Sequence, residues 1–575
     1  MKLLVRYLRP YGRRMLLGLA IKISGTVAEL MLPFILSHVL RVVVARQDLY
    51  EILRWGGAMV VCAILAVTMN VTANRMAAAV ARDSCRTVRR DLFRRTLHLS
   101  AAQTDKFTIP SLESRITSDT YNVTNFVGMM QRIGVRAPIL LIGGVGISVF
   151  MDAHLATVML ALMPVIFALI FCISRWGIPL FTKVQHSMDN MVRVVREDTQ
   201  GIRVIKALSK QDYEHRRYDS VNHALVRDEV HARTVMSLMH PVLNILMNGG
   251  IIAVVVLAAH RVQAGTSNPE TVIAFMQYFT QISMALMSIN RIFTAYTKCA
   301  ASANRILEVL DAPEDLVVHS ADELPDTRTD DHIRFEDVTF TYPRKRTPTL
   351  EHISFSLPRG GHLGIIGATG SGKSTLVKLL LRFYDVSSGS LRISGRDVRT
   401  IDKDELYNMF GTAMQFDFLY ADTVRENILF GRKLTQEQVE YAAVTAQAQE
   451  FIANLNEGYD YMLAQKGSNL SGGQKQRLLI ARAVAAQPDI LVLDDSSSAL
   501  DYKTDAALRQ ALAQRLDGCT VITVAQRVSS IKDCDLILVL DEGQIIGAGK
   551  HEHLMETCSQ YAEISHSQMG GAFID

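Results

Sequence analysis

The sequence predicts a membrane domain of six α-helices followed by a soluble α/β domain, and three observations predict this fold class. Long apolar segments fill the chain as far as residue 300. The remainder has the mixed composition of a soluble α/β domain. Within it, residues 363–381 place a glycine-rich loop between an apolar, strand-like run and a helix-like run. Strand, loop and helix in that order are the context that a phosphate-binding loop requires.

Composition and charge exclude some classes of protein. The formal net charge of +4 on 575 residues is small, so it gives no case for nucleic-acid binding. The seven cysteines are odd in number, scattered and without a C-x-x-C pair, which predicts free thiols in a reducing compartment. No cleavable signal peptide is predicted, because the first apolar segment is long and lacks a small-residue cleavage site.

The membrane half begins with a basic amphipathic stretch at residues 2–14, which we expect on the cytoplasmic face of the bilayer. Six apolar segments follow, each long enough to cross about 30 Å of hydrocarbon at about 1.5 Å per residue. They are residues 15–44, 56–80, 133–151, 155–180, 237–260 and 270–297.

The basic residues predict the orientation of these helices. Arginines cluster after the second span, whereas the turn at 151–154 has no Lys or Arg, so we expect the N-terminus and the long connections in the cytoplasm. The connections at 81–130 and 181–236 are polar and contain few helix breakers, which predicts helices that extend far beyond the bilayer. They form either solvated hairpins or a contact surface for the second half of the chain.

Several polar side chains fall inside the predicted spans, where exposure to lipid is unfavourable. Each either forms hydrogen bonds between helices or lines a water-filled substrate path, and the sequence leaves both alternatives open. These residues are Lys22, Glu29, Asn70, Asn74, Asn244, Asn248, Gln277, Gln281 and Asn290.

The soluble half follows a polar, acidic linker at 311–332, and the alternating run 333–342 predicts its first strand. Tyr342 either stacks its ring on a nucleotide base or packs in the core. In the glycine-rich loop, Lys373 would hold the β- and γ-phosphates and Ser374 would offer its hydroxyl to Mg²⁺. The predicted phosphate-loop residues are Gly367, Ala368, Thr369, Gly370, Ser371, Gly372, Lys373, Ser374 and Thr375.

Two further motifs lie downstream of this loop. Residues 489–494 read as a buried strand that ends in a carboxylate, Asp494, which predicts a Mg²⁺ ligand opposite the phosphate loop. Between the phosphate loop and Asp494, a glycine turn opens a helix and predicts a second phosphate contact. Its residues are Leu470, Ser471, Gly472, Gly473 and Gln474.

Together these motifs resemble those of the ATP-binding cassette (ABC) family, and six spans followed by one cassette resemble a half-transporter of the exporter type. The resemblance covers essentially the whole chain. It implies a transmembrane domain at 1–310, a linker at 311–332, and a RecA-like nucleotide-binding domain with antiparallel β and helical subdomains at 333–575. It also implies ATP and Mg²⁺ as cofactors. The metal ligands that it implies are Ser374, Gln415 and Asp494.

The resemblance extends to contacts between domains and chains. Residues 470–474 match the signature motif, which in this family faces the ATP of a partner chain. Residues 112–119 and 201–206 are similar to the two intracellular loops, whose short coupling helices we expect near 106–113 and 209–217. In this family the second coupling helix docks on the partner's cassette.

The chain departs from the family pattern at the positions that serve hydrolysis. Asp495 stands where the family has the Glu that polarises the attacking water, and its side chain is one methylene shorter. Gln526 stands where the family has a His at the γ-phosphate, and glutamine carries neither a proton nor a charge at neutral pH. A third departure, at 464–467 ahead of the signature motif, has no consequence that the sequence reveals.

These departures predict a degenerate site, one that holds ATP and turns it over poorly, with Asp495, Gln526 and Gln415 at its catalytic positions. The intact signature motif would then serve a partner chain with a competent site. We therefore expect one subunit of a heterodimeric exporter in a bacterial cytoplasmic membrane. A homodimeric exporter with an unusual base, and a membrane regulator that binds ATP without transport, are the alternatives. Drugs, peptides and lipids remain open as substrates.

Overall fold

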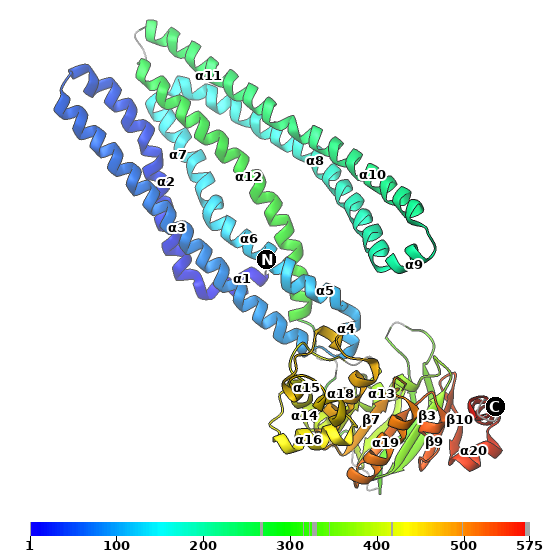
Figure 1. Cartoon of the computed structure of the whole chain (residues 1–575). Helices are drawn as coiled ribbons and strands as arrows, with labels where there is room; N and C mark the ends of the chain where they lie inside the picture. Colours follow the sequence, from blue (N-terminus) through cyan, green and yellow to red (C-terminus); the bar gives the residue numbers. More distant parts are fainter. Residues whose placement is uncertain are drawn as a thin grey trace. The chain divides into compact units, whose positions relative to one another are not determined.

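The computed structural model describes residues 2–264, 268–313, 316–320, 322–324, 330–343, 345–415, 418–496 and 498–569. It divides into two compact units, and Figure 1 labels many of their elements. The membrane unit comprises Met1–His98 and Ile109–Ala312. The nucleotide unit comprises Leu99–Thr108 and Pro313–Asp575.

The membrane unit consists of helices, and its described residues include six helical stretches that are long and apolar enough to cross a bilayer. The prediction of six spans is confirmed. Its α-helices are α1 (Lys2–Leu8), α2 (Gly12–His38), α3 (Leu49–Leu97), α5 (Ile109–Ser114), α6 (Thr120–Met129), α7 (Val135–Met151), α8 (Ala153–Gln200), α9 (Ile202–Ala207), α10 (Gln211–Ser237), α11 (Met239–Gln263) and α12 (Pro269–Leu310).

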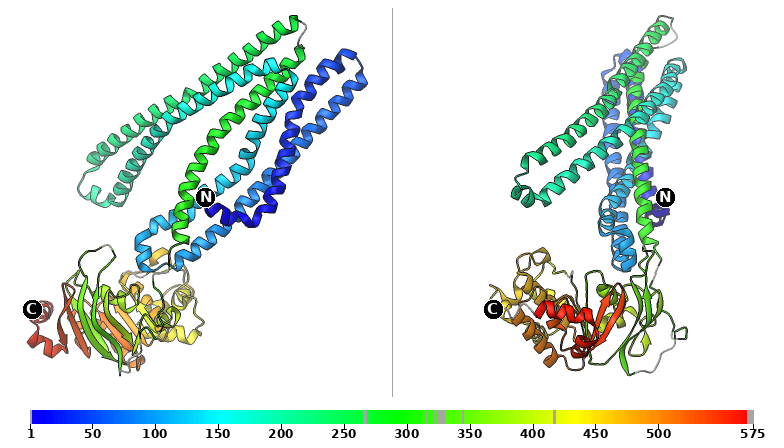
Figure 2. Two further views of the ribbon diagram at one scale, coloured as in Figure 1. Left: turned by 180° about the vertical axis from the view of Figure 1, so that it is seen from behind. Right: turned by 90° about the vertical axis from the view of Figure 1, so that its right-hand side faces the viewer.

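Two of these helices are much longer than a bilayer is thick. α3 has 49 residues and α8 has 48, or about 70 Å each at about 1.5 Å per residue. Asp48 and Asp152 start them as N-caps, each accepting hydrogen bonds from two backbone N–H groups of the first turn. The expected extension beyond the bilayer is confirmed, and Figure 2 shows α8 and α10 running side by side in this region.

Short helices lie close to both ranges expected for coupling helices, and α5 (Ile109–Ser114) overlaps the range 106–113. Two further short helices begin before the expected ranges. The first is α4 (Ala101–Phe107), which starts at a capping box of Ser100 and Gln103 and stops at Thr108, whose φ is +63°. The second is α9, which follows the end of α8 at Gly201. The expected range 209–217 instead spans a bend and the start of α10.

The nucleotide unit contains two sheets. One is antiparallel, in the order β2-β1-β4-β5, and the other has the order β10-β9-β3-β8-β7-β6, in which only β10 pairs antiparallel among the described strands. The strands are β1 (Asp331–Phe340), β2 (Leu350–Pro358), β3 (His362–Gly367), β4 (Ser388–Ile393), β5 (Arg396–Asp397), β6 (Phe410–Ala413), β7 (Ile490–Asp494), β8 (Thr520–Val524), β9 (Leu536–Asp541) and β10 (Gln544–Gly549).

Helices pack on the larger sheet and form a separate subdomain. The described residues of this unit include three apolar cores. One is shared by the two sheets and α13, another is built around α15, α16 and α18, and a third lies between β9 and the C-terminal helices α20 and α21. The predicted α/β fold with antiparallel and helical parts is confirmed. The helices are α13 (Lys373–Leu380), α14 (Lys403–Asn408), α15 (Val424–Leu429), α16 (Gln436–Thr445), α17 (Gln449–Ala453), α18 (Gly472–Val484), α19 (Tyr502–Arg515), α20 (His551–Thr557) and α21 (Ser559–Met569).

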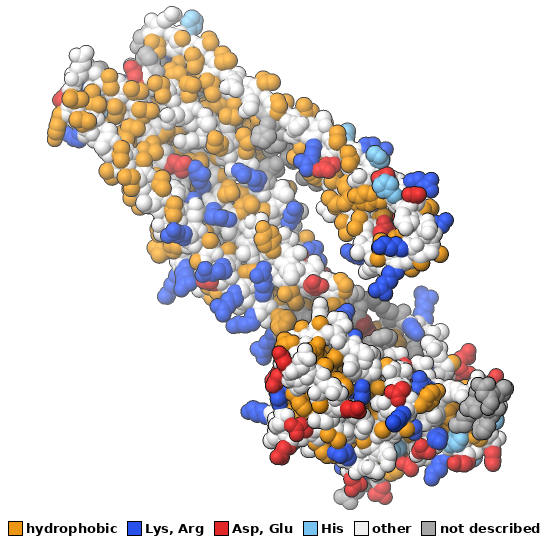
Figure 3. All heavy atoms as spheres, viewed as in Figure 1, with side chains coloured by type: hydrophobic (Ala, Val, Ile, Leu, Met, Phe, Trp, Pro, Cys, Tyr) orange, Lys and Arg blue, Asp and Glu red, His pale blue; other side chains and the backbone are white. Residues whose placement is uncertain are grey.

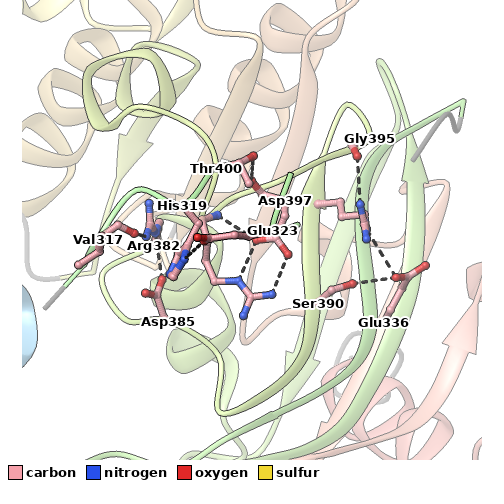
Figure 4. Close-up of polar contacts among 12 residues, drawn as sticks. Val317, His319, Glu323, Glu336, Arg382, Asp385, Ser390, Gly395, Asp397 and Thr400 are labelled. Carbon is pink, nitrogen blue, oxygen red and sulfur yellow. Dashed lines mark hydrogen bonds and ion pairs between the residues drawn. The ribbon is translucent and has the colours of Figure 1, made fainter. Parts of the chain in front are cut away.

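Part of the predicted linker is fixed on the nucleotide unit. The buried guanidinium of Arg382 donates to the carbonyl of Val317 at 2.7 Å, and the N–H of His319 donates to the carbonyl of Arg399 at 2.9 Å (Figure 4). Asp397 holds Arg399 in turn through two side-chain hydrogen bonds. Residues 316–320 are therefore an ordered strap, while 314–315, 321 and 325–329 lie outside the described residues.

Candidate nucleotide site

The glycine-rich loop connects β3 to α13, and two of its glycines are needed for its path. Gly370 and Gly372 have φ of +90° and +104°, where L side chains are strained. A Cβ on Gly372 would also lie 2.6 Å from Cδ2 of Leu350. The loop therefore closes tightly before the first turn of α13, as a phosphate-binding loop must.

Four neighbouring strands bring the candidate residues together around a cavity of about 290 Å³. β3, β8, β7 and β6 are adjacent and parallel, so their carboxyl ends meet at one edge of the sheet. The cavity at this edge is lined by Tyr342, Lys345, Thr349, Thr369, Gly370, Gly372, Lys373, Ser374, Thr375, Gln415, Asp494, Asp495, Val524, Ala525 and Gln526.

Lys373 places its ammonium group at the mouth of the loop. Its Nζ donates to the carbonyls of Gly367 and Ala368 at 2.8 and 2.7 Å. Burial lowers the pKa of Lys373, and the nearby carboxylates of Asp494 and Asp495 oppose that shift. Gly367 and Ala368 thus hold the Lys373 side chain through their carbonyl oxygens, and Lys373 itself lines the cavity.

Asp494 ends β7 and is 3% exposed. Burial and then the charge of Asp495 raise its pKa, and a hydrogen bond with the Ser374 side chain partly offsets this. A buried carboxylate with a raised pKa is stabilised by a cation. Together with the amide oxygen of Gln415, these groups form the hard-oxygen donor set that Mg²⁺ prefers.

The described residues contain no group of three or more His, Cys, Asp or Glu that could hold a metal by themselves. This agrees with Mg²⁺ chemistry, because Mg²⁺ usually takes one or two protein carboxylates and completes its shell with phosphates and water. The residues present therefore fit Mg²⁺ bound together with a nucleotide.

The side chains of Gln415 and Gln526 both contact Asp495. Its Oδ2 accepts hydrogen bonds from Nε2 of Gln526 at 2.9 Å and from Nε2 of Gln415 at 3.2 Å. Its backbone N–H donates to Val524, and its φ is +52°. Burial raises the pKa of Asp495, and the hydrogen bond from Gln415 is the largest opposing influence. We refer to Gln415, Asp495 and Gln526 as the amide clamp.

Tyr342 both lines the cavity and packs. Its hydroxyl lies 3.2 Å from Oγ1 of Thr375, and its ring packs edge-on against Phe340 and Tyr384. Tyr384 in turn donates to Asp105 of α4 at 2.6 Å. One face of the cavity is thus connected through two aromatic rings to the short helix α4.

The predicted signature residues do not line this cavity. Ser471 caps α18, with Gln474 completing the capping box, and Leu470 is buried in the helical core. A Cβ on Gly473 would lie 3.2 Å from the carbonyl of Ala499, so the helix start and the loop before α19 are in close contact. Asp501 caps α19, and the hydrogen bond from the backbone of Thr504 lowers its pKa.

The structure also shows contacts that no motif predicted. Gln568 of α21 donates to the carbonyl of Gln526 and accepts from the N–H of Val528, both at 2.8 Å. It therefore fixes the loop that carries Gln526. Lys345 and Thr349 line the cavity, but neither belongs to a recognisable motif. The sequence gives no signal for these three, because none of them stands in a motif that marks a nucleotide site.

Both units match known protein families. Residues 15–286 match the family model described as ABC transporter transmembrane region, and residues 350–498 match the model described as ABC transporter. A solved structure of a bacterial Atm1-family ABC exporter with ATP bound has the same fold, with a TM-score of 0.79, 24% identity and coverage of 98% of each chain.

Several curated proteins are similar over nearly the whole chain. An uncharacterized ABC transporter ATP-binding protein of Mycobacterium tuberculosis is 33% identical over 577 residues, which is 98% of each chain. A protein of Bacillus subtilis with the same description is 32% identical, again over 98% of each. An ATP-dependent lipid A-core flippase of Photobacterium profundum is 30% identical over 84% of this chain and 82% of its own.

One membrane region of six spans joined to one phosphate-loop domain defines a multi-pass membrane half-transporter with the exporter fold, its nucleotide unit cytoplasmic. With 33% identity over 98% of its length to an ABC transporter ATP-binding protein, this chain belongs to the ABC transporter family.

Proposed function

We propose that this chain is an exporter half-transporter that holds ATP at a degenerate site and pairs with a second, catalytically competent half-transporter. The amide clamp is the observation that carries the proposal. Asp495, at the position of the catalytic carboxylate, accepts hydrogen bonds from two neutral amides. These hydrogen bonds occupy Oδ2 of Asp495, a carboxylate oxygen that would otherwise accept a hydrogen bond from the attacking water.

The clamp affects turnover more than binding. A carboxylate one methylene shorter lies about 1 Å from the family position, and a displacement of that size can lower a rate about 10²-fold. Gln526 donates a hydrogen bond but cannot exchange a proton at neutral pH. In contrast, the phosphate loop and Asp494 keep the residue types that binding requires.

The other residues have roles in binding. Backbone N–H groups of residues 367–375 and the start of α13 would surround the phosphates, and Lys373 would neutralise their charge. Ser374, Gln415 and Asp494 would hold Mg²⁺, which stabilises the negative charge of the phosphates. Tyr342 would stack on the adenine. Residues 470–474 would contact the ATP that is held by the phosphate loop of the partner chain.

The domain boundaries at 1–310, 311–332 and 333–575 and the second chain are part of the same proposal. One relative is named as a lipid A-core flippase, which favours an amphiphile among the three substrate classes. Drugs and peptides remain alternatives.

Turnover by the chain alone tests the proposal. We expect the purified chain to bind ATP tightly and to hydrolyse it slowly, with little further loss in D495N. Brisk, vanadate-sensitive turnover that collapses in D495N would instead show a homodimeric ATPase. Co-expression with a half-transporter that has Glu and His at these positions should give one fast and one slow site in a single turnover. Equal rates at both sites would refute the asymmetry, and a pair without substrate flux would indicate a regulator.

A further inference from the structure

The membrane unit contains a lysine that is buried between two helices. Lys22 of α2 is 3% exposed, and its Nζ donates to Oδ1 of Asn70 at 2.7 Å and to Oδ1 of Asn74 at 3.1 Å, both on α3. Both acceptors are neutral amides. A buried ammonium is unfavourable unless an anion compensates it, and amides compensate its charge only in part.

More cations lie nearby than one carboxylate can neutralise. Arg136 pairs with Glu29, and Arg132 donates to the carbonyl of Gly128. Glu29 follows Lys22 by two turns of α2, Arg136 follows Arg132 by one turn, and α2 packs against α7, so the four side chains lie in one region. Both arginines and Glu29 act electrostatically on the Lys22 ammonium. Three cations and one carboxylate leave a local net charge of +2. The described residues of this cluster therefore lack the anion that would balance them.

The cluster lies at a depth where a headgroup can reach it. At about 1.5 Å per residue, Lys22 is about 36 Å along the helices from the α2–α3 turn, and Arg136 is about 22 Å from the α7–α8 turn. The hydrocarbon layer is about 30 Å thick. The cluster thus extends from the cytoplasmic half of the span to its inner boundary. Basic side chains also gather over this half on the face shown in Figure 3, while the α2–α3 end is largely hydrophobic.

We propose that Lys22, Arg132 and Arg136 form a binding site for the anionic headgroup, phosphate or carboxylate, of an amphiphile. Asn70 and Asn74 hold the Lys22 ammonium in place. The side chain of Arg136 is 45% exposed and would contact the headgroup directly, while Glu29 competes with the ligand for that guanidinium. This deepens the proposed function by giving the chemical class of the cargo, and it rests on that function only for the transport step.

The proposal predicts effects of opposite sign for two partners in one ion pair. We expect the full chain in neutral detergent to bind fluorescent phosphatidylglycerol about 10-fold more tightly than fluorescent phosphatidylcholine, as charge-assisted contacts would give. R136Q and K22M should remove this preference. E29Q should strengthen phosphatidylglycerol binding several-fold, because it removes the competing carboxylate.

The matched control is R46Q, which removes an exposed arginine that pairs with Glu51 near the α2–α3 turn. It should leave the preference unchanged. If R136Q and E29Q weaken binding alike, the pair is structural and the site is refuted. An equal loss in R46Q would show non-specific attraction and would also refute it. Because Arg136 is exposed and Glu29 is only half-buried, the test holds even if K22M does not fold.

Two further arms identify the ligand. If inorganic phosphate competes with phosphatidylglycerol, the headgroup suffices for binding. If phosphate does not compete, the acyl chains are also required. Either result supports an amphiphile site when R136Q removes the preference. ATP-dependent movement of phosphatidylglycerol in proteoliposomes with a partner chain tests the cargo class. Binding of phosphatidylglycerol without its movement would support the site and overturn the cargo class. Normal ATP turnover by the same pair would show that the proposed function itself has not failed.

Discussion

The two walls of the nucleotide cavity differ in where their side chains are directed. Lys373 of the phosphate loop and Asp494 of β7, together called the loop wall, carry opposite charges. Burial lowers the pKa of Lys373 and raises the pKa of Asp494, and we propose that the two receive phosphate and metal. The amide clamp, called the clamp wall, is directed inward instead, because Gln415 and Gln526 both donate to Asp495. In the function that we propose, the residues that would bind ATP and those that would set the rate of its hydrolysis differ, with Gln415 alone in both sets. The comparison therefore teaches that affinity and rate can change separately.

The largest expected effect comes from the loop wall. K373A should weaken ATP binding about 1,000-fold, because each lost hydrogen bond to a charged group is worth about 1.5–3 kcal/mol and two phosphates lose a partner. Equilibrium binding of a fluorescent ATP analogue measures this. K433A, which changes an exposed lysine, should bind normally. A K373A protein with wild-type affinity would contradict the assignment of this wall to binding.

Restoring the family residues should act on the clamp wall alone. The double variant D495E/Q526H should raise turnover in the full chain by about 10- to 100-fold, since it returns the carboxylate by about 1 Å and supplies a titratable group. The dissociation constant for ATP should change little. D517E, at an exposed loop position, is the matched control. An unchanged rate with normal folding would mean that the clamp does not limit turnover.

A smaller effect is expected where the loop wall connects to α4. Y384F removes the hydrogen bond to Asp105 and should destabilise the packing of α4 by about 1 kcal/mol. Hydrogen exchange of residues 101–107 should become several-fold faster, while exchange in α19 stays the same. Y407F, at a partly exposed tyrosine of α14, provides the control. Equal exchange of α4 in both variants would show that this bond contributes nothing.

The smallest effect concerns pH. The pKa of Asp494 in the folded protein lies above its ordinary value of 3.8, so the folded state binds this proton more tightly than the unfolded state. Nucleotide-free protein therefore loses stability as pH rises through the raised pKa. D494N should melt a few degrees higher than wild type near pH 7, with the two converging near pH 4. A difference independent of pH would exclude ionisation of Asp494 as its cause.

The sequence predicts the six spans and the α/β fold because both depend on local patterns of apolar and glycine residues. It predicts which residues meet at the cavity because parallel strands end at one edge. It does not give the bounds of the short helices α4 and α9, since these depend on a capping box at Ser100 and on residues with positive φ at Thr108 and Ser209.

Side-chain contacts over long sequence separations are also beyond the sequence. Lys22 and Asn70 are polar residues in two spans, and only the packing of α2 on α3 shows that they touch. Of the polar residues in the spans, Asn290 has a side chain outside the described residues. Gln568 carries no motif, yet it fixes the loop of Gln526 from 42 residues away.

The placement of α4 within the nucleotide unit determines where the boundaries of a recombinant nucleotide-binding fragment should lie. Ala101 and Ala102 pack against the main apolar core there, and Asp105 accepts from Tyr384. A recombinant fragment that begins at Pro313 would leave that patch bare and prone to self-association. Adding a synthetic peptide of residues 99–108, or fusing it ahead of the fragment, should keep the fragment monodisperse.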